Sequence, residues 1–116
     1  MNARLKSAVK LDRKIALYIP ATVDVDKSAD NSAQVDRAAA LLSDLFGGAT
    51  IQPGAGCWMS DSAGLVKEAT TLVYAFCDAA GIDAGLDAVL DFSEKLKVEM
   101  AQESIAVEIN GVLYLI

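Results

Sequence analysis

The fold is decided by residues 65–77, LVKEATTLVYAFC. Side chains alternate between two faces along this stretch, as they do in a strand whose faces meet different surroundings. One face carries the even-numbered positions, which are Val66, Glu68, Thr70, Leu72, Tyr74 and Phe76. The odd-numbered positions, including Lys67, lie on the opposite face. We therefore predict one long strand here.

Immediately before this strand, residues 49–60 read ATIQPGAGCWMS. The stretch is apolar enough for a strand, but Pro53-Gly54-Ala55-Gly56 predicts an interruption by a turn or a bulge. Residues 61–64, DSAG, are typical of a turn. We expect a broken strand, a turn, and then the long strand.

Before and after this hairpin, segments whose apolar residues recur every two positions, as in a strand, alternate with segments that have the roughly 3.6-residue period of a helix. Gly47-Gly48 ends the first helix, and Asn110-Gly111 is a strong signal for a two-residue type I′ turn. The predicted elements are a strand at 14–22, a helix from Asp30 or Asn31 to Phe46, a helix over 84–102, a strand at 104–109 and a terminal strand at 112–116.

The predicted order is β-α-β-β-α-β-β, whose first six elements follow the ferredoxin-like pattern. We expect an α+β fold in which two helices cover one face of an antiparallel sheet of four or five strands. The expected organisation is a basic, flexible arm over 1–13 and a single α+β domain over 14–116.

Charge divides the chain in the same way. The 116 residues carry 10 Lys and Arg against 16 Asp and Glu, a net charge of −6. Residues 1–14 hold 5 basic groups and 1 acidic group (+4), and the other 102 residues hold 5 and 15 (−10). With His at 0, a Ser-His-Asp triad, a Cys-His pair and a His metal site are all excluded.

No apolar run approaches the ~18 residues of a membrane span, and no secretory leader is evident. We expect a cytoplasmic protein that does not bind membranes. Cys57 and Cys77 are then expected to be reduced and mostly buried thiols.

Two loops offer incomplete motifs. Asp24, Asp26, Ser28 and Asp30 match the first positions of a calcium loop, but Ala29 replaces its glycine and Val35 its glutamate. The Gly54-Ala55-Gly56 stretch lacks the Gly-Lys-Ser/Thr of a phosphate loop. We expect no metal site and no cofactor, and we interpret the glycines as a bulge or a close approach of a ligand to the backbone.

The helix-free face of the sheet offers the best candidate site. If Ile15, Leu17 and Ile19 face the helices, Tyr18 and Glu108 share the open face. Glu68 or Lys67 joins them, depending on which face of their strand is open, and Trp58 lies across the hairpin. The candidate binding surface is therefore Tyr18, Trp58, Glu68 and Glu108. Two carboxylates and two aromatic rings can perform acid–base chemistry or bind a cation.

The same face could instead be covered by a protein partner, including a second copy in a homodimer, or be solvated. The basic arm could contact nucleic acid, but it carries no aromatic residue for stacking on bases. Nucleic acid is therefore not expected as a partner except through this arm.

Several segments resemble a group of small, mostly uncharacterised bacterial proteins of plasmids, phages and other mobile elements. The most specific are the LFGGAT helix end (45–50), Gly56-Cys57-Trp58 and the LVKE start (65–68) of the long strand. The resemblance implies a ferredoxin-like sheet and a mobile-element origin. It implies no catalytic residue.

These observations favour a non-enzymatic, acidic protein-interaction module, and the resemblance suggests a modulator or inhibitor of a host defence system. An acidic body can occupy a basic groove by charge complementarity. The alternative is a small enzyme or small-molecule-binding protein that uses the open face around Trp58 and Glu68.

Overall fold

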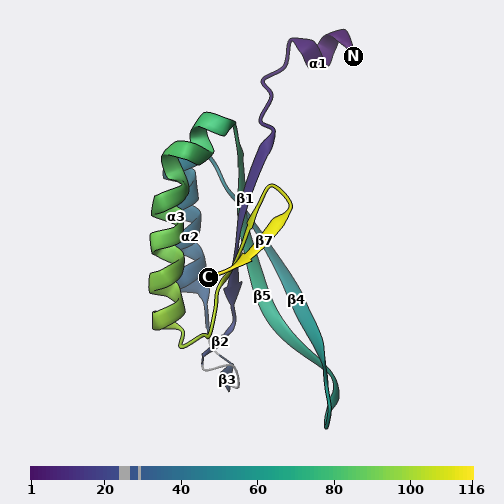
Figure 1. The fold of residues 1–116 in the computed structure, drawn as a ribbon, viewed down its shortest axis with the longest axis vertical. Coiled ribbons are helices and arrows are strands. Elements are labelled where there is room, and N and C mark those ends of the chain that lie inside the picture. The colour runs from purple at the N-terminus through teal and green to yellow at the C-terminus, as the bar shows by residue number, and fades with distance from the viewer. Residues whose placement is uncertain (24–26, 29) are drawn as a thin grey trace.

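A computed structural model describes residues 1–23, 27–28 and 30–116. The α+β class is confirmed: a five-stranded antiparallel sheet is covered on one face by two long helices (Figure 1). Asp24, Asp26 and Ala29 of the calcium-loop comparison lie outside the described residues. Within the described residues, no group of three or more His, Cys, Asp and Glu side chains could hold a metal ion.

The large sheet has the strand order β4-β5-β1-β6-β7, with every neighbouring pair antiparallel. The strands are β1 (Arg13–Pro20), β4 (Thr50–Ser60), β5 (Gly64–Cys77), β6 (Ala106–Ile109) and β7 (Val112–Leu115). A separate pair is formed by β2 (Thr22–Val23) and β3 (Lys27–Ser28).

The two long helices are α2 (Ser32–Phe46) and α3 (Ala79–Glu99). They pack on the face of β1 that carries Ile15, Leu17 and Ile19, all fully buried. Because apolar side chains at alternate positions of β1 and β5 meet helix stripes there, this layer forms the core. Its remaining members include Val35, Leu42, Val73, Val89, Leu96 and Val107.

Two predicted boundaries were wrong. β4 runs without interruption through Pro53–Gly56, because each of these residues pairs with β5 and Pro53 lies on an edge strand, where its missing N–H is tolerated. Helix α3 begins at Ala79 rather than near residue 84 because the Asp78 carboxylate caps it, accepting a hydrogen bond from Gly81 N at 2.8 Å.

Residues 1–12 lie outside the folded layers and are all exposed. They contain a single helical turn, α1 (Ala3–Lys6), with an Asn2 cap. Of the two thiols, Cys77 is buried as expected, whereas Cys57 is exposed on edge strand β4, so that part of the expectation was wrong. No helix in the described ranges combines the length and apolar character needed to cross a membrane.

Candidate functional site

The register of the sheet places all four candidate residues on the open face. Lys14, Ala16 and Tyr18 alternate along β1 with the core residues Ile15, Leu17 and Ile19, so they lie on the face of the sheet opposite the helices. Ala16 pairs with Tyr74 on one side and with Glu108 on the other. The even-numbered positions of β5, including Glu68, therefore share the open face, and Lys67 does not.

Tyr18 and Glu108 form a direct contact on this face. The Tyr18 hydroxyl donates a hydrogen bond of 3.1 Å to Glu108 Oε1. Burial, this hydrogen bond and the nearby negative charge, in that order, raise the pKa of Tyr18 above its ordinary value. The phenol therefore stays protonated and acts as a donor at neutral pH.

Lys14 completes this cluster and was missed by the sequence interpretation. Its Nζ lies 4.0 Å from Glu108 Oε2 and 4.7 Å from the centre of the Tyr74 ring. The Tyr74 ring also packs edge-on against Phe76, with centroids 6.0 Å apart. The sequence could have predicted this position, because Lys14 and Tyr18 are both even-numbered residues of β1 and therefore lie on the same face. The result is a polar and aromatic cluster that presents a cation, a carboxylate and a phenol to solvent.

Trp58 and Glu68 lie together elsewhere on the same face. Glu68 pairs with Gly56, and Trp58 pairs with Val66, so the two side chains are diagonal neighbours on adjacent strands. Opposite Thr70 and Glu68, β4 carries Gly54 and Gly56 and presents bare backbone. A flat ligand can therefore approach the β4 backbone beside a half-buried carboxylate and an indole.

Within one chain, these two pairs do not form a single cluster. Glu68 is four positions along β5 from Leu72, which pairs with Tyr18, and six from Tyr74, which is in line with Glu108. These separations correspond to roughly 13 Å and roughly 20 Å along the strand. Beyond Thr70, β5 continues past the last pairing with β1, so the β4–β5 hairpin extends beyond the helices (Figure 1). All four residues therefore share one face of the sheet, as expected, but they do not lie together as one continuous surface.

The projecting hairpin exposes large apolar side chains. Trp58 is 53% exposed, Met59 72% and Leu65 53%. A two-stranded ribbon gains little stability by itself, and clustered exposed apolar residues are typical of surfaces that bind a partner.

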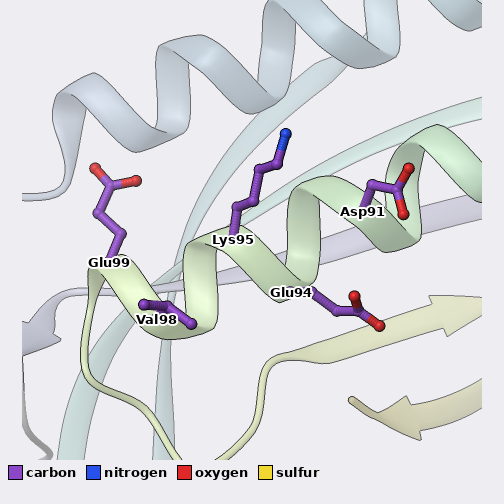
Figure 2. A pocket seen from close by; sticks show the side chains of 5 residues that line it. All are labelled: Asp91, Glu94, Lys95, Val98 and Glu99. Carbon is purple, nitrogen blue, oxygen red and sulfur yellow. The ribbon is translucent and has the colours of Figure 1, made fainter.

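A hollow on the other side of the molecule has a different character. It lies on α3 and is lined by Asp91, Glu94, Lys95, Val98 and Glu99 (Figure 2). Glu99 forms an ion pair with Arg37 of α2, which lowers the pKa of Glu99. Because four of the five lining side chains are charged and all five are solvent-exposed, we interpret this region as a solvated helix surface.

The sequence matches no protein-family model and no curated protein. The fold, however, is similar to two solved structures over nearly the whole chain. One is a phage SAM lyase in complex with S-methyl-5'-thioadenosine, with a TM-score of 0.64 and 16% identity, covering 95% of this chain and 93% of that one. The other is a phage SAM lyase in the apo state, with a TM-score of 0.65 and 20% identity, covering 95% of each chain.

This likeness overturns the main functional expectation. A non-enzymatic interaction module was expected, but the similar structures are enzymes that act on a small molecule. The finding favours the alternative, a small enzyme or small-molecule-binding protein. The use of the open face around Trp58 and Glu68 stays a prediction. The expectation that nucleic acid is not a partner, except through the arm, stays a prediction.

Proposed function

We propose that this protein is a SAM lyase, an enzyme that cleaves S-adenosylmethionine to S-methyl-5'-thioadenosine. The observation that carries the proposal is the similarity over 95% of the chain to phage SAM lyases, one of which holds S-methyl-5'-thioadenosine. The same similarity supports a phage or other mobile-element origin.

We also propose that the fold is ferredoxin-like. The strand order β4-β5-β1-β6, with α2 following the β1 region and α3 following β5, supports this topology. The edge strand β7 is then the additional C-terminal element.

The chemistry of this substrate suits the open face. S-adenosylmethionine carries a sulfonium cation next to a planar adenine nucleoside. A carboxylate such as Glu68 attracts the cation, and an indole such as Trp58 offers both cation–π attraction and a stacking surface. The side-chain-free backbone at Gly54 and Gly56 allows a planar ring to lie close to β4.

In the proposed reaction, the bond between sulfur and Cγ of the methionine part breaks, and its electron pair goes to sulfur. The leaving thioether is neutral S-methyl-5'-thioadenosine. A lyase adds no water, so the electron pair that Cγ loses is replaced from within the substrate. Either the substrate's own carboxylate closes a lactone ring on Cγ, or Cβ loses a proton to a base. Glu68 or Glu108 would accept that proton in the second case.

The separation of the two clusters supports an assembly in which at least one further copy of the chain completes the site. Along β5, Glu68 lies roughly 13 Å from the position of Tyr18 and roughly 20 Å from that of Glu108, so the two pairs do not enclose one small site in a single chain. Small-molecule sites are normally concave. A second copy lying on the open face would cover the exposed hairpin and enclose a ligand between the copies.

The direct test is incubation of the purified protein with S-adenosylmethionine, followed by mass spectrometry of the products. We expect S-methyl-5'-thioadenosine together with a four-carbon amino acid or lactone, whose identity distinguishes the two routes. Glu68→Gln should lower the rate at least about 100-fold. Glu103→Gln, at an exposed position outside the sheet, should leave the rate unchanged. Absence of S-methyl-5'-thioadenosine with the unaltered protein would refute the proposal.

A further inference from the structure

A second apolar surface lies at the β7 edge of the sheet. Helix α3 and the β6–β7 hairpin enclose a groove with a volume of about 530 Å³. Its lining is apolar apart from one carboxylate and one phenol: Leu86, Leu90, Glu94, Ile109, Tyr114, Leu115 and Ile116. Tyr114 is 50% exposed and Leu115 69% exposed, so the groove is open in this chain.

The N-terminal segment, residues 1–12, has the complementary character. Met1, Leu5 and Val9 are 87%, 65% and 90% exposed and recur every four residues, which places them on one side of a helix. Helix α1 already forms one turn of this segment. The segment is too short to hold a helix without a surface to pack against.

Charge complementarity matches the segment to the groove. Residues 1–11 carry three basic side chains, Arg4, Lys6 and Lys10, and no acidic one. Of the acidic side chains of helix α3, Glu94 lines the groove, and Asp83 and Asp87 each precede a groove residue, Leu86 or Leu90, by three positions, which places them next to it on the helix surface. In Figure 2, Glu94 points away from α2 and toward the strands, whereas Lys95 points toward α2.

The direction in which the segment leaves the body favours a second copy. Leu11 lies in a small hollow with Phe46 of α2, Cys77 at the end of β5 and Gly81 in the first turn of α3. The groove lies on the other flank of α3, against β6 and β7. Figure 1 shows α1 beyond the end of the sheet, well separated from the body. Within its own chain, the segment is therefore directed away from the groove.

We propose that residues 1–12 of a second copy of this chain dock into the groove between α3 and β7 as an amphipathic helix. Met1, Leu5 and Val9 contact Leu86 and Leu90, and the basic side chains face the acidic residues of α3. The groove shares no residue with the candidate binding surface of Tyr18, Trp58, Glu68 and Glu108, so the proposal does not rest on the proposed function.

Disulfide trapping tests this contact directly. In a Cys57→Ser background, which removes the exposed thiol, a chain carrying Leu5→Cys is coexpressed with a differently tagged chain carrying Leu90→Cys. Oxidised glutathione then accepts the two electrons as the two thiols form one disulfide. We expect a cross-linked species containing both tags. The matched control Lys95→Cys, on the flank of α3 that faces α2, should yield at least tenfold less of it.

Two outcomes would overturn the proposal. One is a mixed-tag yield no higher than that of the Lys95→Cys control. The other concerns a single chain that carries both Leu5→Cys and Leu90→Cys. If the disulfide forms only within that chain and not between two chains, the segment docks on its own body.

A second measurement does not depend on altering the groove. Leu5→Asp with Val9→Asp changes only exposed positions outside the folded layers, so the body should fold normally. Sedimentation at a series of concentrations should show self-association weakened at least tenfold in this variant. Unchanged self-association would contradict the proposal, and a circular dichroism spectrum identical to that of the unaltered protein verifies folding.

Discussion

Gly85 of α3 packs against Phe46 and Leu45 of α2. A Cβ placed on Gly85 would lie 2.9 Å from Cζ and 3.0 Å from Cε1 of Phe46, which is closer than real Cβ contacts allow. Gly85 is buried, and the Phe46 ring packs against the core. This glycine therefore permits the close approach of α2 and α3.

Substituting Gly85 by Ala has two opposing effects on the free energy of unfolding. Alanine favours a helix interior by about 1 kcal/mol relative to glycine. Displacing the Phe46 ring in a packed interface costs about 2 kcal/mol. Because the packing cost is larger, we expect Gly85→Ala to lower the free energy of unfolding by about 1 kcal/mol.

Urea denaturation followed by circular dichroism measures this change. With an m-value of about 2 kcal/mol/M, a loss of 1 kcal/mol lowers the midpoint by about 0.5 M. The neighbouring Ala84 is exposed, so Ala84→Gly reports the helix preference alone and should cost about 1 kcal/mol. In a Phe46→Leu background, Gly85→Ala should become stabilising because the ring is absent. A stabilising effect of Gly85→Ala in the unaltered background would refute the reasoning.

Three further predictions concern polar contacts and a turn. Because the folded-state pKa of Tyr18 is raised, its contribution to stability is present below about pH 10 and is lost as pH rises further. The variant Tyr18→Phe cannot donate a hydrogen bond to Glu108, so its melting temperature should be lower than that of the unaltered protein at pH 8. Above pH 10, its melting temperature should fall less steeply with pH than that of the unaltered protein, which thermal melts measure. The pKa of Glu99 is lowered, chiefly by Arg37, so Arg37→Gln should cost up to about 0.5 kcal/mol at pH 7. That difference should disappear as pH falls through the folded pKa of Glu99, which melts across pH 2 to 7 measure. Gly111 has a φ of +86°, so Gly111→Ala should destabilise by about 1 kcal/mol in urea titrations.

Local patterns predicted most of the elements. Alternation along residues 65–77 predicted β5, and Gly47 ends α2 in the left-handed conformation, with φ at 87°. The turn residues Asn110 and Gly111 both have positive φ, as a type I′ hairpin requires. These predictions are correct because each structural feature depends on residues that are adjacent in the chain.

The failures arise where distant residues override a local preference. Pro53 to Gly56 resemble a break, yet an entire partner strand supplies hydrogen bonds along them. Asn31 is positioned as a helix cap, but its side chain donates to the carbonyls of Ile19 and Pro20 instead. Neither outcome can be predicted from the adjacent residues in the sequence, because the hydrogen-bond partners are more than ten residues away.

The sequence alone determined the alternation of β5, the absence of histidine chemistry, and the division into a basic arm and an acidic body. Tertiary structure decided which face of β5 is open, and therefore that Glu68 rather than Lys67 joins Tyr18 and Glu108 on it. It also placed Glu68 roughly 13 Å along the sheet from Tyr18 and roughly 20 Å from Glu108. The physical reason is that alternation assigns side chains to two faces, but only helix packing selects the buried face and only strand register sets distances along it.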